Sequence, residues 1–144
     1  MSPEQVSLRI GELQSELTSR VGQRAATVSR MGQIEVLMGE LDRLLGSLAE
    51  VRSEMVFVRA KVQGLALDVT GAWYGDHRAR CESECGLAEE DCTRRVVALD
   101  GAVTRLRVRR AGLTAEWDGL SGQRSGHGNR ISAIDAELAR LRRL

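Results

Sequence analysis

The sequence predicts an all-α protein, a long antiparallel helical hairpin that turns at Trp73-Tyr74-Gly75. Apolar residues recur at alternating steps of three and four in both halves of the chain, which is the spacing of a coiled-coil seam. The only proline is Pro3, in the first turn of the expected helix, where its missing N–H does no harm. Aromatic residues are 3% of the 144, which fits helices packed along a narrow seam better than a globular core.

The first helix is expected over residues 4–70. Residues three or four apart lie on one helical face, so a single stripe collects the apolar side chains of this half. Arg24 and Arg52 interrupt the stripe. Its apolar members are Val6, Ile10, Leu13, Leu17, Val21, Val28, Met31, Ile34, Met38, Leu41, Leu45, Leu48, Met55, Val58, Val62, Leu65 and Val69.

The turn is expected over residues 71–76, where two glycines and an aspartate bracket two aromatic residues. Gly71 can adopt the left-handed conformation that ends a helix, and Asp76 can cap the helix that follows. Because the turn lies close to the midpoint of the chain, we expect two arms of similar length, each burying its apolar stripe on the other.

The second helix is expected over residues 77–118, with Arg110 interrupting its seam. Its seam residues are Cys81, Cys85, Ala88, Cys92, Val96, Leu99, Val103, Leu106, Leu113 and Trp117. Residues 119–129 then contain four glycines and two serines. A glycine inside a helix costs about 1 kcal/mol relative to alanine. We therefore expect a hinge or loop at 119–129 and a separate, short final helix over 130–143, all within one elongated domain spanning 1–144.

Composition excludes several classes of function. The chain has 21 basic and 20 acidic residues and a net charge of +1, so no strong field attracts nucleic acid or an anionic membrane. No apolar run approaches the roughly 20 residues of a membrane span, so no membrane insertion is expected. The N-terminus lacks the basic and then apolar layout of a cleaved signal, which favours a cytoplasmic location.

Three cysteines, Cys81, Cys85 and Cys92, follow His77 at helical spacings. Soft ligands on one helical face could bind zinc or copper. The same cysteines occupy seam positions, however, where a thiol packs as a small apolar group. Packing is the favoured interpretation, and we expect no metal or other cofactor. An odd number of thiols, reduced in a cytosolic setting, is consistent with this interpretation.

No pattern typical of an enzyme occurs in the sequence. There is no nucleophile elbow, phosphate-binding loop or His-Glu-x-x-His sequence. The spacing of the acidic residues within 82–91 places most of them on the outer helical face. We therefore expect no enzymatic activity.

Trp73 and Gly75 form a Trp-x-Gly motif at the turn of a helical hairpin. In this the chain resembles the Trp-x-Gly superfamily of small helical proteins of bacterial type VII secretion, and in its length the YwqH-like branch that accompanies the LXG toxins. The C-terminal heptads of that branch are matched here by Ile131, Ile134, Leu138 and Leu141. A second copy of the motif, Trp117-Asp118-Gly119, lies off the turn, so the resemblance depends on position. Many secreted members also carry a Tyr-x-x-x-Asp/Glu signal, which is absent because Arg78 stands four residues after Tyr74.

The resemblance implies a non-enzymatic, protein-binding partner of a type VII secretion substrate such as an LXG toxin. Such a partner acts as a targeting factor, a chaperone or a co-secreted subunit, exported without a cleaved signal if it leaves the cytoplasm. Its own partner would be the helical N-terminal domain of the toxin or another small Trp-x-Gly protein, with homo-oligomers as a further option. The turn motif and the four residues of the final heptads are the candidate binding residues. The alternative is a self-associating structural coiled coil with no secretion role.

Overall fold

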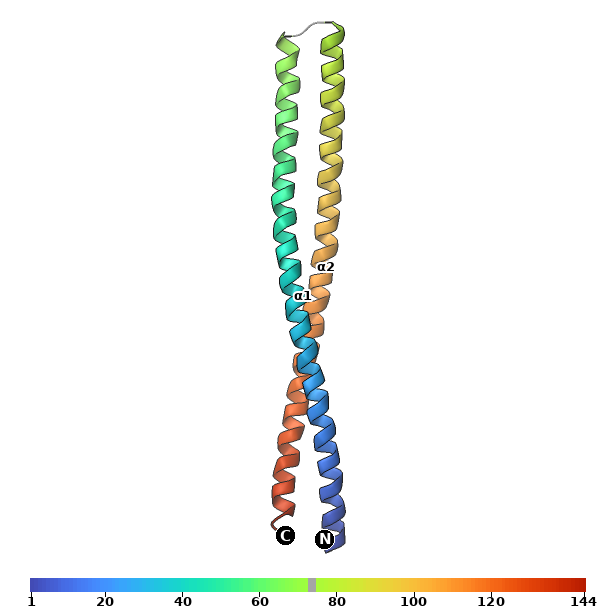
Figure 1. Cartoon of the computed structure of the whole chain (residues 1–144), viewed down its shortest axis with the longest axis vertical. Helices are drawn as coiled ribbons and strands as arrows, with labels where there is room; N and C mark the ends of the chain where they lie inside the picture. The colour runs from blue at the N-terminus through green and yellow to red at the C-terminus, as the bar shows by residue number, and fades with distance from the viewer. Residues whose placement is uncertain (73–74) are drawn as a thin grey trace. The chain divides into compact units, whose positions relative to one another are not determined.

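The structure is a helical hairpin made of two long α-helices packed against each other (Figure 1). Helix α1 spans Pro3–Ala72 and helix α2 spans Asp76–Leu141. The computed structural model describes residues 1–72 and 75–144, with side chains outside 66–72. These residues contain no strand. The all-α hairpin predicted from the heptad spacing is confirmed.

The hairpin divides into two units. The terminal unit consists of Met1–Met38 and Ala111–Leu144, and the turn unit is the continuous segment Gly39–Arg110. Each unit pairs a segment of α1 with an antiparallel segment of α2, and both chain termini lie side by side at one end of the terminal unit (Figure 1).

In the terminal unit the seam follows an unbroken heptad, with no shift at Arg24. Thr27 is 7% exposed, whereas Val21 and Val28 are 51% and 46% exposed. The seam therefore passes through positions 20, 24 and 27, and the prediction that Val21 and Val28 belong to it is wrong. The polar residues Arg20, Arg24 and Thr27 occupy these seam positions because the steps of three and four residues continue unchanged along the helix. Placing Val21 and Val28 in the seam would require a local change in the supercoil.

The hinge predicted at 119–129 does not exist: α2 is helical throughout this stretch, and there is no separate final helix. Three ion pairs cross the terminal unit: Arg9–Glu137, Arg130–Glu16 and Arg30–Glu116, with Nε–Oε1 distances of 3.1, 2.6 and 2.8 Å. From the first pair to the second, the chain advances seven residues on α1 and retreats seven on α2, and the third pair lies fourteen residues further on both helices. The register is thus regular across the glycines.

A helix persists through this glycine-rich stretch because packing on both sides of it outweighs local propensity. Leu113 is 1% exposed before the stretch and Ile134 is fully buried after it. Both ends of the segment are therefore fixed against α1. The cost of about 1 kcal/mol per glycine lowers the stability of the helix without breaking it.

The core of the terminal unit lies at its open end. Leu13 and Ile134 are fully buried, and Leu138 and Leu141 are 3% and 2% exposed. Val6, Ile10 and Leu17 pack against this cluster. Burying one such aliphatic side chain contributes about 2 kcal/mol.

The turn unit keeps a regular register with a thinner core. Among its described residues, only Cys92 and Val96 are buried apolar residues. Three polar pairs cross it: Arg110–Asp42, Arg52–Asp100 and Gln63–Glu89. Successive pairs lie ten and then eleven residues apart on both helices. Arg52 and Arg110 therefore occupy seam positions without interrupting either helix.

The turn is shorter than the predicted 71–76, because α1 continues to Ala72 and α2 begins at Asp76. The left-handed glycine is Gly75, with φ +74°, a conformation that favours glycine. Its carbonyl accepts a hydrogen bond from the Ala79 N–H at 3.2 Å, so Gly75 occupies the N-cap position expected for Asp76. Asp76 lies in the first turn, where its negative charge favours the helix N-terminus.

Candidate partner-binding surfaces

The turn motif is only partly described. Trp73 and Tyr74 lie outside the described residues, and their binding role stays a prediction. Gly75 is exposed, and a Cβ built on it would meet no atom within 4 Å. Its positive φ, and not a close approach of another segment, is therefore what requires glycine at this position.

The C-terminal heptads are not free to bind a partner. Ile134, Leu138 and Leu141 form the core cluster with Leu13, and Ile131 is half-buried. For Ile134, Leu138 and Leu141 the assignment to an external partner is thus corrected, because their side chains are buried in the interface between α1 and α2, whereas for Ile131 it stays a prediction. The sequence showed their heptad spacing, but spacing alone does not reveal which helix covers a seam.

The cysteines are seam residues, as the packing interpretation expects. Cys92 is buried, and Cys81 and Cys85 are half-buried. His77 lies on the exposed surface of the first turn of α2. Within the described part of the chain, no three His, Cys, Asp or Glu side chains come together in a way that could hold a metal ion. The structure therefore does not assemble His77 and the three thiols into a ligand set.

Charged side chains replace apolar ones in the middle of the terminal seam. Glu16 pairs with Arg130 at 2.6 Å and with Arg20 at 3.9 Å. The hydrogen bond from Arg130, reinforced by the positive charges of Arg130 and Arg20, lowers the pKa of Glu16. Arg20 Nη1 lies 3.1 Å from His127 Nδ1. Because a guanidinium only donates, Nδ1 is the acceptor in this hydrogen bond.

In the turn unit, the polar pairs gather on one flank of the seam. Asp42, Asp100 and Gln63 each follow a seam residue by one position, which is heptad position e. Arg110 donates to Asp42, and Arg52 donates to Asp100, both with Nε–Oδ1 distances of 2.6 Å. These hydrogen bonds lower the pKa of both aspartates. Both seam arginines thus reach out of the seam on this flank.

The opposite flank of the turn unit carries an apolar column on α1. Leu44, Val51, Val58 and Leu65 follow one another at intervals of seven residues, all at heptad position g. They are 46%, 39%, 45% and 56% exposed. A helix with apolar residues at a, d and g buries two adjacent stripes, as the helices of three- and four-helix bundles do. The hairpin covers only one of these stripes.

The apolar column opens into a groove between the helices. Val51 of the column and the half-buried seam residues Met55 and Leu99 line this groove, together with Ala98 and Arg95. Arg95 is paired with Asp91 four residues earlier, at 3.0 Å. The groove is thus mainly apolar, with its one cation already neutralised by a neighbour.

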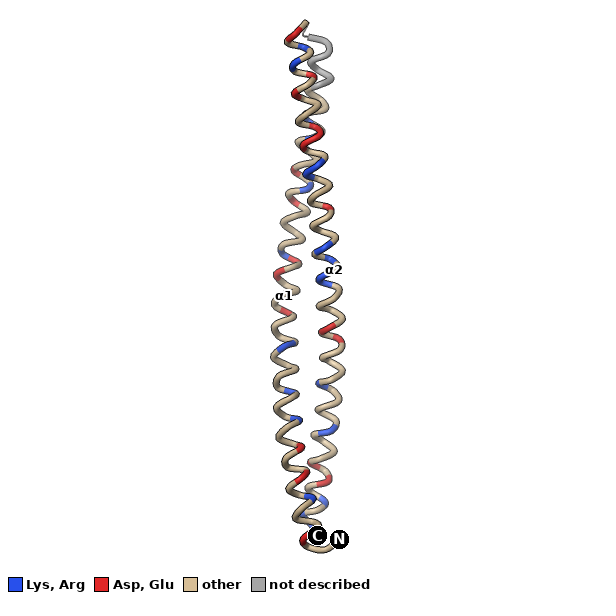
Figure 2. The backbone as a smooth tube through the Cα atoms, turned by 90° about the vertical axis from the view of Figure 1, so that its right-hand side faces the viewer, with Lys and Arg blue, Asp and Glu red and all other residues tan. Residues whose placement is uncertain are grey.

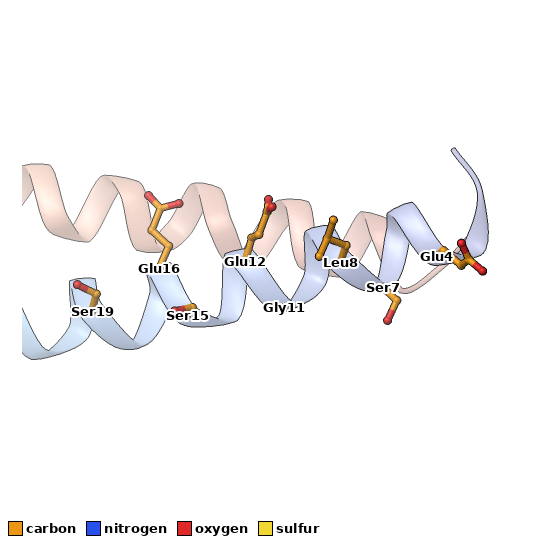
Figure 3. A pocket seen from close by; sticks show the side chains of 8 residues that line it. All are labelled: Glu4, Ser7, Leu8, Gly11, Glu12, Ser15, Glu16 and Ser19. Carbon is orange, nitrogen blue, oxygen red and sulfur yellow. The ribbon is translucent and has the colours of Figure 1, made fainter.

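A second exposed surface lies on α1 of the terminal unit. Small residues recur there every four positions, namely Ser7, Gly11, Ser15 and Ser19 (Figure 3). Figure 3 shows them following one another along α1 with Leu8 as the single large apolar neighbour. Glu4, Glu12 and Glu16 flank them. A small-residue face permits close approach of another helix, but it offers little apolar area to bury.

The charges themselves define no binding surface. Figure 2 shows acidic and basic residues interspersed along the described parts of both helices. Within the described residues, neither helix contains a stretch long and apolar enough to cross a membrane.

Comparison with known proteins adds no identification. No family model matches the sequence, and neither the curated proteins nor the solved structures gave a significant match. The apolar column, which the sequence analysis assigned to the seam (Val58, Leu65) or left unremarked (Leu44, Val51), is the candidate site that the structure adds. A search for a second heptad column beside the first would have found these four residues in the sequence, but not their exposure.

Proposed function

We propose that the chain is a non-enzymatic protein-binding hairpin that packs helices of another polypeptide against the apolar column of its turn unit. The observation that carries this proposal is the column itself, four large aliphatic side chains at strict heptad spacing and about half exposed. Covering one such side chain contributes about 1 kcal/mol. A further helix laid along the column would therefore stabilise both partners.

The resemblance to Trp-x-Gly proteins supports a narrower proposal. The partner is then the helical N-terminal domain of a type VII secretion substrate such as an LXG toxin, or another small Trp-x-Gly protein. The hairpin serves as a targeting factor, chaperone or co-secreted subunit. Trp73 and Gly75 at the turn support this proposal, as does the hairpin architecture.

The test is co-expression with the product of the neighbouring gene. We expect that gene to encode a large protein with a helical N-terminus and a variable toxic C-terminus. The two proteins should co-purify, and the mass of the intact complex gives the stoichiometry. Val51→Glu/Val58→Glu should abolish co-purification, whereas Val97→Glu/Val108→Glu, on exposed positions away from the column, should not. Failure of the wild-type chain to bind any such product would refute the secretion proposal.

The alternative is a self-associating structural coiled coil with no secretion role. The heptad spacing that runs without interruption through both units supports it. Purification of the chain as fibres or large assemblies, with no helical toxin encoded nearby, would favour this alternative.

A further inference from the structure

We propose that the occupant of the apolar column is a single amphipathic helix of another protein, with one acidic and one basic edge beside its apolar stripe. This inference rests on the proposed function, in which the column binds helices of another polypeptide. It adds the charge pattern that such a helix carries, and it follows from the lining of the groove and from the charges along the two edges of the groove.

The groove beside the column is the seat for this helix. It is lined by Val51 and Met55 of α1 and by Ala98 and Leu99 of α2. Because Met55 and Leu99 are also seam residues, a helix seated here extends the existing core instead of starting a new interface. The large column side chains form the wall on α1, and the short side chain of Ala98 lets a helix approach α2 closely. This is how a third helix packs onto a pair in a helical bundle.

The α2 edge of the groove is positively charged near Leu44. Arg95 and Ala98 line the groove, so residues seven or fourteen positions after them lie on the same face of α2, and these include Arg105 and Arg109. In the register of the polar pairs across the turn unit, Leu44 lies between the heights of Arg105 and Arg109. Both arginines are exposed, and neither forms an ion pair or hydrogen bond with a described residue.

The α1 edge of the groove carries the opposite charge. A helical residue three positions after a column residue, or four positions before it, lies on the side of the column that faces away from the seam. Glu54 follows Val51 by three positions, and Glu40 precedes Leu44 by four. Both glutamates are exposed, without an ion pair among the described residues. From Leu44 to Val51 the two edges of the groove are therefore of opposite sign.

This charge pattern ends towards the turn. Lys61 lies on the α1 edge, but its Nζ is 4.7 Å from the centroid of the Phe57 ring, so its charge already interacts with α1 itself. Glu84 lies on the same face of α2 as Ala98, at a height beyond Leu65, which is the last residue of the column. A partner helix thus meets its unpaired charges at the end of the column that is remote from the turn.

A helix complementary to this groove has carboxylates on the edge that faces α2 and lysines or arginines on the edge that faces α1. Reversing the direction of a helix in the groove exchanges its two edges. A helix with one acidic and one basic edge therefore matches the groove in one of its two directions, whereas a helix with two edges of the same sign matches it in neither.

The first experiment titrates the full-length chain into a fluorescein-labelled synthetic helix and follows the anisotropy. The probe has about 22 residues, enough to span the column at about 1.5 Å per residue, with leucines at heptad positions a and d, glutamates at e and lysines at g. Two control peptides keep the leucines and carry glutamate at both edges or lysine at both edges. We expect the probe to bind about ten-fold more tightly than either control, because each control turns one attractive edge into a repulsive one. Equal affinities for the three peptides would overturn the inference.

The second experiment changes the edge of the groove. Arg105→Glu/Arg109→Glu makes both edges acidic, so this variant should prefer the peptide with lysine at both edges. The matched control is Arg107→Glu/Arg140→Glu, which makes the same change of charge at exposed positions of α2, one on the opposite flank of the turn unit and one in the terminal unit. This control should keep the preference of the wild type. The same change of preference in both variants would show that net charge, and not the edge of the groove, selects the peptide.

The third experiment identifies what occupies the column. Val51→Glu/Val58→Glu should lose the binding of all three peptides while keeping its helicity, because both positions are already part-exposed, at 39% and 45%. Val97→Glu/Val108→Glu, at positions 66% and 69% exposed, should bind like the wild type. Sedimentation equilibrium should give one chain of 15.8 kDa with one peptide. A chain that is dimeric without peptide and becomes monomeric in Val51→Glu/Val58→Glu would show that a second copy occupies the column, and the inference would be wrong.

The inference and the proposed function fail in different ways. If the three peptides bind equally and Val51→Glu/Val58→Glu abolishes their binding, the column binds helices as proposed but the charged edges do not select them. If the probe is preferred but the neighbouring gene product does not co-purify, the inference stands and the secretion proposal fails.

Discussion

The terminal and turn units follow the same heptad pattern but bury it to different degrees. Of the nine buried apolar residues among the described side chains, seven lie in the terminal unit: Leu13, Met31, Ile34, Leu113, Ile134, Leu138 and Leu141. Cys92 and Val96 are the two in the turn unit. The terminal unit therefore covers most of its apolar surface with its own second helix.

The reason lies in where each unit places its large aliphatic residues. The terminal unit has Ile and Leu at four successive seam positions of α2, from Ile131 to Leu141. The turn unit has Cys81, Cys85 and Glu89 at positions of its α2 that face α1, and all three are half-buried. Four further large residues of this unit, Leu44, Val51, Val58 and Leu65, lie in the column beside the seam and are about half exposed. The comparison teaches that one unit closes the hairpin and the other leaves surface for another chain.

The largest expected effect is the loss of stability when the terminal core is truncated. Ile134→Ala removes a fully buried side chain from the cluster that holds the two chain ends together. We expect a loss of about 3 kcal/mol in the free energy of unfolding, measured by urea titration followed by circular dichroism.

The matched variant in the turn unit is Val96→Ala, at a seam residue 6% exposed. It removes fewer carbons from a thinner core, and we expect a loss of about 1 kcal/mol. Equal losses for the two variants would show that the units contribute equally, contrary to the difference in burial.

The next effect is a gain in stability in the glycine-rich stretch of α2. Gly122 and Gly126 are exposed helical residues, and a Cβ on either would meet no atom within 4 Å. Gly122→Ala/Gly126→Ala should therefore raise the free energy of unfolding by about 2 kcal/mol in total, at about 1 kcal/mol per glycine. A lower thermal midpoint for this double variant would mean that the segment uses non-helical conformations after all.

The sequence alone predicted the fold class well, because a seam of three and four steps over such long stretches has no common alternative to paired helices. It failed where local propensity and packing disagree. The glycines of 119–129 favour a loop, but the residues on either side of them are fixed against α1. Val21 and Val28 look like better seam residues than Arg20 and Thr27, but the register is set by the heptads around them and not by the residues themselves.

The candidate site was harder to predict than the fold. Leu138 and Leu141 have the spacing of a binding stripe whether α1 or another protein covers them. Which stripe is left uncovered depends on how the hairpin closes, and that follows from the register across both helices. Leu44 and Val51 could be recognised as exposed only once the register was known.

A smaller effect is expected at the turn. Gly75 has φ +74°, where a residue with a Cβ is strained. Gly75→Ala should lower the free energy of unfolding by about 1 kcal/mol, while Gly64→Ala, in an exposed and open part of α1, should raise it. If the free energy of unfolding falls in the first variant and rises in the second, the loss at Gly75 comes from backbone strain and not from a general effect of alanine. A higher free energy of unfolding in both variants would contradict the left-handed conformation of Gly75.

The smallest expected effect is the dependence of stability on acid. Ion pairing lowers the pKa of Glu16 in the terminal unit and of Asp42 and Asp100 in the turn unit. Since each carboxyl binds its proton less readily in the folded state, its contribution is fully present above the ordinary carboxyl pKa of about 4 and is lost as the pH falls through the lowered value. Stability should therefore decline below about pH 4, and less steeply in high salt, because these pairs are solvent-exposed. Asp42→Asn/Asp100→Asn should flatten the decline more than Glu16→Gln does, because it removes two carboxyls with a lowered pKa whereas Glu16→Gln removes one. A steeper acid response in the double variant would mean that these aspartates do not gain from their arginines, and that the turn unit is held together by its thin apolar seam alone.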